Sequence, residues 1–249
     1  MAEEIKRPVP SVQSDERAAG SFGSFQRAAW AVLRKDVRSE LRTRYALNAL
    51  AVFALTVVLV VSFYLGPRLS PRDPVTPATN ATLLWIALFF SALTGLGRAF
   101  IQEEEAQTAT FLRLNAPPLA VFVGKWLLNL LLLAGLSVVV TLLLSLFMNV
   151  RIANIAMFAL TLALGGLGLS TTITLIAAII AKASARSALF AVLAFPVVFP
   201  MLVIAITATE QALTGAPWSA ALPQIQGLGA YAVAMTAAAI FLFPYVWEV

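Results

Sequence analysis

Two residue types that carry much of protein chemistry are missing from this chain: its 249 residues include no cysteine and no histidine. Without cysteine there can be no disulfide, no redox-active thiol and no thiolate metal site. Without histidine the chain lacks the commonest metal ligand and the usual general base at neutral pH. We therefore expect no catalytic residue, no bound cofactor and no metal in this chain.

Charged residues are also scarce. They form 12% of the chain, against about 25% in soluble domains, while 60% of the residues are hydrophobic and the mean hydropathy is +0.88. A membrane-spanning helix needs about 20 consecutive apolar residues. Charge-free intervals long enough to span occur at Tyr45–Pro67, Pro74–Gly97, Trp126–Val150, Ile152–Ala181, Ser187–Thr209 and Leu228–Val246. Glycines and prolines predict a loop between Gln211 and Gly227. The sequence therefore predicts an all-α membrane protein with six transmembrane helices.

Lysine and arginine are distributed unevenly along these intervals. Nine of the seventeen precede the first span and five lie in loops on the same side, while only Arg68, Arg72 and Arg151 lie in loops on the other side. The positive-inside rule then places both termini in the cytoplasm. The pI near 10.0 indicates anionic lipid headgroups as partners and no nucleic acid, which would need a soluble basic domain.

The segment before the first span divides in two. Residues 1–24 are rich in Pro, Ser, Gly and charge, which predicts a disordered cytoplasmic tail, and residues 25–248 form the membrane domain. From residue 25 apolar positions recur three or four apart between basic ones, as in Trp30, Leu33, Arg34, Lys35, Arg38 and Leu41. This pattern predicts an amphipathic helix lying in the inner interface. The alternative is a basic flank that only sets topology.

The loop between spans two and three holds the most conspicuous charge in the chain. Glu103, Glu104 and Glu105 form its only acidic run, and Phe111, Leu112 and Arg113 follow before a proline pair. Acids at the start and a base at the end suit a helix dipole, and the prolines stop the helix. A helix over Glu103–Leu114 cannot bury its apolar side alone, so a cytoplasmic partner could cover it. The alternative is a solvated loop kept soluble by its glutamates.

No source of chemical energy is visible in the chain. Gly124-Lys125 resembles the end of a P-loop, but position 119 is Leu and position 126 is Trp, so no phosphate cradle can form. The hydrolase pattern G-x-S-x-G is absent. No acidic or basic side chain lies inside a predicted span, which argues against an ion-coupled transporter. Any vectorial work must draw its free energy from outside.

Two spans carry further signals. In span four, Gly165, Gly166 and Gly168 precede Ser170 and hydroxyl-bearing threonines, a composition that favours close helix packing over a substrate path. In span five, Pro196 and Pro200 lie four apart and predict a kink, with a hinge for opening and closing as the more specific alternative.

Several short motifs occur together in a recognisable order. They are the basic run Arg34–Arg44, Gly95–Phe100 at the end of span two, Glu103 with Glu105, Ala116-Pro117, Gly124-Lys125 with Asn129, and the tail Phe243–Glu248. On these residues the chain resembles the heme exporter protein B (CcmB) family, the membrane subunits of the ABC-type complex of bacterial cytochrome c maturation. The resemblance covers about residues 25–248. The chain departs from it in Ala106–Arg113, which lacks the glycine of many members, and in the first outer loop.

The resemblance implies a six-helix permease of the ABC-2 exporter type in the bacterial inner membrane. Glu103–Leu114 would be its coupling helix, moved by a separate ATPase subunit (CcmA-like) that binds the ATP. Further partners would be a heme-handling subunit (CcmC-like), a small membrane subunit (CcmD-like), a heme chaperone (CcmE-like) and a second copy of this chain. Heme would be handled by the complex, and because only Met or Tyr could ligate its iron here, we expect tight ligation in a partner.

Two other functions stay open on the sequence alone. One is an ABC-2-type permease that exports a lipid, a glycan or a drug. The other is a membrane scaffold that assembles maturation proteins without a transport cycle. An intramembrane enzyme is the weakest alternative, because no nucleophile–base pair is visible.

Overall fold

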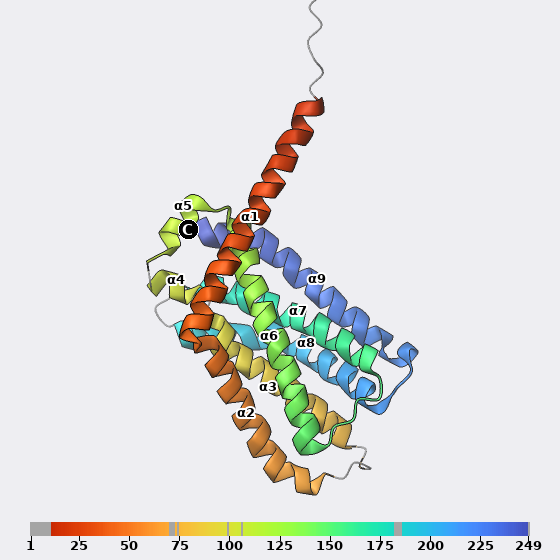
Figure 1. The fold of residues 1–249 in the computed structure, drawn as a ribbon. Coiled ribbons are helices and arrows are strands. Elements are labelled where there is room, and N and C mark those ends of the chain that lie inside the picture. The colour runs from red at the N-terminus through yellow and green to blue at the C-terminus, as the bar shows by residue number, and fades with distance from the viewer. Residues whose placement is uncertain are drawn as a thin grey trace, which may run out of the picture.

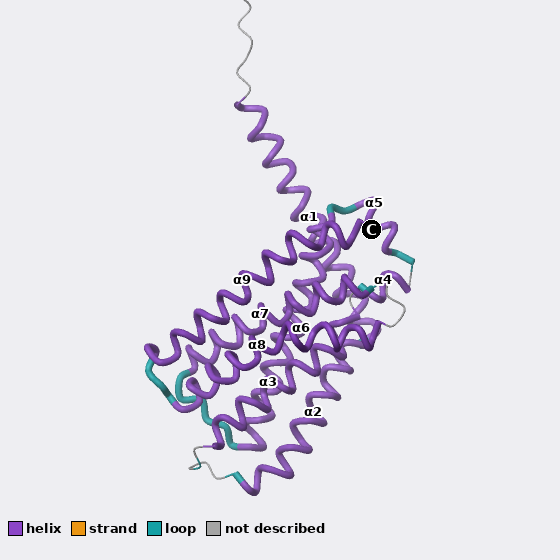
Figure 2. Tube along the Cα trace, turned by 180° about the vertical axis from the view of Figure 1, so that it is seen from behind, coloured by secondary structure: helices purple, strands orange, loops and turns teal. Residues whose placement is uncertain are grey.

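The computed structural model describes residues 11–69, 73, 75–98, 100–105, 107–181 and 186–248, and within them every regular element is a helix. The order is α1 Ser11–Thr43, α2 Tyr45–Leu65, η1 Gly66–Arg68, α3 Val75–Gly95, η2 Leu96–Arg98, α4 Ile101–Glu105, α5 Ala109–Asn115, α6 Pro118–Met148, α7 Ile155–Ile180, α8 Arg186–Thr214 and α9 Trp218–Glu248. The long helices form one bundle, with α1 projecting from one end of it (Figure 1 and, from behind, Figure 2).

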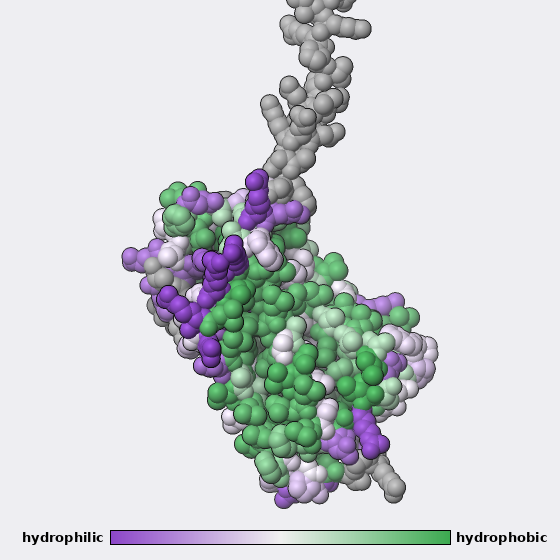
Figure 3. Space-filling view, viewed as in Figure 1, coloured by the Kyte–Doolittle hydropathy of each residue, from purple (hydrophilic) through white to green (hydrophobic). Residues whose placement is uncertain are grey.

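Six of these helices are long and apolar enough to cross a membrane: α2 with η1, α3, α6, α7, α8 and α9. Each overlaps one of the six predicted spans, so the prediction of an all-α protein with six helices able to span a membrane is confirmed. In Figure 1 the C-terminal end of α9 lies at the same end of the bundle as α1, α4 and α5. Space-filling in Figure 3 shows hydrophilic residues gathered at this end, with a hydrophobic surface over α2 and α6. By the positive-inside rule this end would face the cytoplasm, and that orientation stays a prediction.

The third span begins earlier than predicted. We placed its start at Trp126 because Lys125 read as a loop residue, but α6 starts at Pro118 and Lys125 is buried inside it. Proline at the first helical turn is favourable because its missing N–H has no partner there in any case. The expectation that no charged side chain lies within a spanning helix is therefore wrong at Lys125.

The loop predicted between Gln211 and Gly227 is also wrong. Helix α8 continues to Thr214 and α9 begins at Trp218, so only Gly215–Pro217 connects them, with Gly215 at φ +74°. Pro223 lies close to the start of α9, where a proline removes a single backbone hydrogen bond without ending the helix. Composition overstated the breaking effect of the glycines and prolines in this segment.

The N-terminal boundary differs as well. The tail predicted to be disordered over residues 1–24 is helical from Ser11, and residues 1–10 lie outside the described residues. A polar composition does not prevent a helix when nothing blocks the backbone, and no proline occurs between Pro10 and Pro67. Helix α1 ends at Thr43 because Arg44 adopts φ +54°, and α2 begins at the next residue.

Helix α7 is the most buried of the six spans. A Cβ on Gly165 would lie 2.2 Å from the Trp85 ring of α3, so only glycine allows this approach. Side-chain hydrogen bonds then join α7 to its neighbours: Asn129 of α6 donates to Thr174 over 2.9 Å, and Trp126 donates to Thr171 over 3.0 Å. The predicted use of small and hydroxyl residues for packing is therefore what the structure has.

Helix α8 runs without interruption through Pro196 and Pro200. Both prolines are exposed on the outside of the bundle, as are the neighbouring Phe195 and Phe199. Phe195 still contacts α3, because its ring centre lies 6.3 Å from that of Phe89. The hinge proposed at these prolines stays a prediction.

Candidate functional site

The connection between α3 and α6 is made of two short helices that meet at a tight turn. The single helix predicted over Glu103–Leu114 is wrong, because α4 ends at Glu105 and α5 starts at Ala109. Gln107 has φ +55°, its N–H donates to the Glu104 carbonyl over 3.2 Å, and the Thr108 N–H donates to the Glu103 carbonyl over 3.0 Å. This is the Schellman pattern that ends many helices. The turn places Thr108 and α5 back against the bundle.

Glu103 is the centre of a buried group of charges drawn from three helices. Its Oε1 lies 2.9 Å from Nζ of Lys125 in α6 and is also paired with Lys35 of α1, while Thr108 donates its hydroxyl to Oε2. Asp36 of α1 pairs with the same two lysines, over 3.2 Å to Lys35 and 3.1 Å to Lys125. We call Lys35, Asp36, Glu103 and Lys125 the ion quartet. Two cations and two anions leave it with no net charge.

Burial differs among the four members. The exposed fraction of the side chain is 2% for Lys125, 8% for Glu103, 12% for Asp36 and 47% for Lys35. Such deep burial of charge is tolerated only when each group is paired and hydrogen-bonded. The quartet therefore holds α4 in one position against α1 and α6, since displacing any member would leave a buried charge unpaired.

The electrostatics keep two members charged at neutral pH. Burial alone would raise the pKa of Glu103, but Lys125 and the hydrogen bonds from Lys35 and Thr108 lower it from 4.5 to about 2. Burial likewise would lower the pKa of Lys35, but the neighbouring Asp36 and Glu103 raise it above 10.5. Around neutral pH neither group changes its charge, so their ion pair continues to link α4 with α1.

An aromatic cluster lies directly beside the quartet. Nζ of Lys125 is 5.3 Å from the centre of the Phe100 ring, and Phe100 packs against Phe243 and Trp247 at 5.5 and 5.8 Å between ring centres. Phe122 joins Phe243 at 5.0 Å. The last turn of α9 is thereby fixed to the start of the α4 segment, which brings a third long helix to the site.

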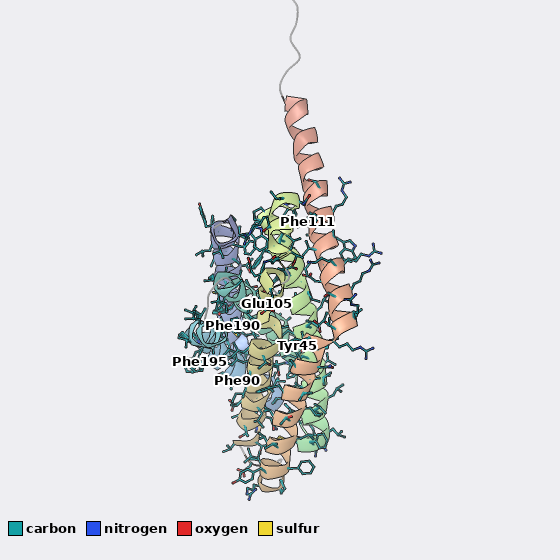
Figure 4. All side chains as sticks on the ribbon, turned by 90° about the vertical axis from the view of Figure 1, so that its left-hand side faces the viewer. Tyr45, Phe90, Glu105, Phe111, Phe190 and Phe195 are labelled. Carbon is teal, nitrogen blue, oxygen red and sulfur yellow. The ribbon has the colours of Figure 1, made fainter. Side chains whose placement is uncertain are left out.

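Helix α5 has one side on the bundle and one side in solvent. Ala109 and Leu112 are buried, whereas Phe111 is 67% and Leu114 is 80% exposed. Arg113 pairs with Glu104 over 2.9 Å, and its guanidinium lies 5.0 Å above the Trp247 ring. Figure 4 shows Phe111 and Glu105 at the hydrophilic end of the molecule. We call the exposed Phe111 and Leu114 the α5 ridge. The segment that carries this ridge is held to the bundle by the contacts of its buried side.

Helix α1 packs on the bundle through one face. Its buried apolar residues are Ala29, Val32 and Leu33, and a Cβ on Gly124 of α6 would lie 2.8 Å from the Val32 side chain. Trp30 and Leu41 are exposed. The packed face also carries two acids with partners in the bundle, because Asp36 pairs with Lys125 and Glu40 accepts from the Leu47 N–H. An interfacial position for α1 stays a prediction.

The structure thus unites part of the predicted site and adds residues that the prediction missed. It joins Glu103 to Lys35 and Glu104 to Arg113, and it exposes Phe111 while burying Leu112. Arg34, Arg38 and Glu105 are exposed. The residues missed were Asp36, Phe100, Thr108, Lys125 and Trp247. One signal was available: Lys125 stands next to an apolar run of helical length, where a charge needs a partner.

Comparison with known proteins finds one family and one curated relative of note. Residues 27–244 match the family described as CcmB protein. Heme exporter protein B of Bradyrhizobium diazoefficiens is 29% identical over 186 residues, which are 74% of this chain and 82% of that protein. The family match contains the whole ion quartet and both short helices.

Proposed function

We propose, from the premise that this chain belongs to the CcmB protein family, that it is the membrane subunit of an ABC-type transporter complex in cytochrome c biogenesis. A separate ATPase subunit would supply the free energy, and the complex would deliver heme or release its chaperone. The multi-pass fold with six spanning helices and the relative named as a heme exporter support this proposal. The bacterial inner membrane is the expected location.

The observation that carries the proposal is the two-sided character of α5. An apolar ridge of Phe111 and Leu114 is costly to leave in water on a soluble surface, and it suits a groove on a cytoplasmic partner. The segment beneath it is tied to α1 and α6 through the ion quartet and to α9 through Arg113 and Trp247. A CcmA-like ATPase that grips the ridge could therefore displace three long helices together.

This arrangement suggests how ATP-driven closure would act on the membrane. When two ATPase subunits approach each other, the α5 ridge would move with them. Because the quartet is buried and neutral, α4 would not detach from α1 and α6 under this force, since separation would leave unpaired charges out of water. A second copy of this chain would complete a path or a gate between the two halves, with Pro196 and Pro200 as candidate hinge positions.

Heme itself would be ligated by another subunit. The chain has neither His nor Cys, so its only candidate axial ligands are Met and Tyr, which are less common choices for this role. A CcmC-like subunit with its CcmD-like companion, and a CcmE-like chaperone, would hold the iron. We expect the purified chain, titrated with hemin, to lack a stoichiometric ligated-iron absorption spectrum. Appearance of such a spectrum would assign heme ligation to this chain.

The ridge can be tested with Phe111→Ala and Leu114→Ala. Both side chains are exposed, so the stability of the isolated chain should stay the same. Binding of the ATPase subunit should weaken by about 30-fold for Phe111→Ala if this residue is a hot spot worth ~2 kcal/mol. Maturation of c-type cytochromes should fall in parallel.

A matched control is Phe63→Ala, because Phe63 is 72% exposed but lies near the C-terminal end of α2, the end that is remote from α1. Equal ATPase binding by the Phe111→Ala variant and the unchanged chain would contradict the proposal. A second control is an ATPase subunit that binds but cannot hydrolyse ATP. Full cytochrome maturation with that subunit would favour a scaffold over a transporter.

A further inference from the structure

Helix α1 carries a basic groove that the coupling site does not use. The groove is a shallow, open hollow on the surface of α1, and its lining includes Arg27, Trp30, Arg34, Lys35 and Arg38. Among the described residues, no acid belongs to its lining. Its residues recur three or four apart, so they form one stripe along the helix. The groove therefore combines four cationic side chains with one indole.

The position of the groove relative to the membrane spans narrows what it can bind. The opposite face of α1, with Ala29 and Val32, packs on α6, so the groove faces away from the bundle. Leu41 and Tyr45 are exposed beyond it, toward the first span. In Figure 3 the hydrophilic residues of α1 border the hydrophobic surface of the bundle. Along the chain the basic groove is followed by the apolar Leu41 and Tyr45 and then by the first span. This order matches a phospholipid, whose charged headgroup is followed by its acyl chains.

We infer that this groove binds the phosphate headgroup of an anionic phospholipid of the inner leaflet. Guanidinium groups match phosphate oxygens with paired hydrogen bonds. Basic residues beside a membrane attract anionic lipids, and an indole is well placed at headgroup level. The acyl chains would lie along Leu41, Tyr45 and the exposed face of α2. A soluble phosphate or nucleotide would use the arginines but would gain nothing from this apolar surface.

The same groove touches the ion quartet. Lys35 lines the groove with its half-exposed side chain and also pairs with Asp36 and Glu103. A headgroup bound there would add a third anion around Lys35 and would make its withdrawal from the bundle more costly. The lipid would therefore stabilise α1 and α4 in their present arrangement, whether or not the chain serves a transporter.

The test uses the purified full chain, stripped of lipid in detergent and titrated with phosphatidylglycerol or with phosphatidylcholine of the same acyl chains. Native mass spectrometry reports the bound lipid. The unchanged chain should prefer phosphatidylglycerol. In the double variant Arg34→Gln/Arg38→Gln the preference should fall by about five-fold for each arginine removed. Both side chains are exposed, and a melting curve checks that the variant is folded.

Arg68→Gln/Arg151→Gln is the matched control, because it removes the same charge from exposed arginines outside the groove. It should keep the preference for phosphatidylglycerol. An equal loss in the control, or no loss in the groove variant, would overturn the inference. Displacement of phosphatidylglycerol by millimolar inorganic phosphate would assign the groove to soluble anions. Release of a cytoplasmic protein by the groove variant with an unchanged lipid preference would make the groove a protein interface.

Discussion

Replacing Lys125 by methionine would test whether the ion quartet holds the α4–α5 segment in place. Methionine keeps the length of the side chain and removes only its charge. Asp36 and Glu103 would then share Lys35 alone, and the quartet would change from neutral to a net negative charge. Because Glu103 and Asp36 have side chains only 8% and 12% exposed, water could compensate for little of this change.

The cost can be estimated in two ways. Removing one partner of a buried ion pair typically costs about 3–5 kcal/mol. The pKa of Glu103 gives a second figure: a fall from 4.5 to about 2 corresponds to ~3 kcal/mol between its two protonation states. Because Lys35 and Thr108 would still contact Glu103 and solvent reaches Lys35, we take a value below both figures, about 2 kcal/mol. We expect the segment to open about 30-fold more often.

The absence of cysteine makes the opening measurable. Ala109 at the start of α5 is 2% exposed, so a cysteine introduced there should react with a maleimide only when the segment leaves the bundle. The labelling rate of Ala109→Cys should rise about 30-fold when Lys125→Met is added. Lys35→Met should raise it less, because solvent already reaches Lys35.

A double variant separates charge pairing from general damage. Lys125→Met with Glu103→Gln removes both partners and leaves Lys35 paired with Asp36, so its labelling rate should lie well below the sum of the two single effects. The reasoning is refuted if Lys125→Met labels at the rate of its parent. It is also refuted if the two substitutions add without interaction.

Two further predictions follow from the same region. The lowered pKa of Glu103 stabilises the folded chain fully above pH 4.5, and this stabilisation is lost as the pH falls toward 2. The raised pKa of Lys35 stabilises the folded chain below pH 10.5, and this stabilisation is lost above that value. Hydrogen-exchange protection of α5, corrected for intrinsic rates, should follow this window, and constant protection down to pH 2 would contradict it. Gly124→Ala should lower the free energy of unfolding by ~1–3 kcal/mol, because its Cβ would lie 2.8 Å from Val32. Gly135→Ala in the same helix meets nothing within 4 Å and should be neutral or stabilising. Equal melting temperatures of the two variants would contradict the close packing of α1 on α6.

The fold could be predicted from the sequence because lipid imposes a simple length requirement on apolar runs. Charge-free intervals located all six spans. Their ends were less certain, because a charge in the sequence does not say whether a partner will neutralise it. Lys125 was assigned to a loop on its charge alone, yet its partners come from Asp36 and Glu103, which lie far from it in the chain. Only the packed helices bring these groups together.

The role of the α4–α5 segment stays a prediction, whereas its local structure can be compared with the sequence. The acidic run and Phe111 indicated a helix between the second and third spans. The break at Gln107 was missed, because a residue other than glycine adopts the left-handed conformation there and nothing in the composition signals it. The packing of α1 on α6 was not predicted either, since it depends on Ala29 and Val32 fitting against Gly124. Pairwise fit of this kind is invisible to a periodicity argument.

The single residue between α1 and α2 has a consequence for motion. Glu40 of α1 accepts a hydrogen bond from the Leu47 N–H of α2 over 2.9 Å, so a side chain also links the two helices on either side of Arg44. Because only one residue connects the two helices, a tilt of α1 would rotate α2 as well. A movement of α1 at the inner leaflet would then reach the outer surface through α2, without any change in the centre of the bundle.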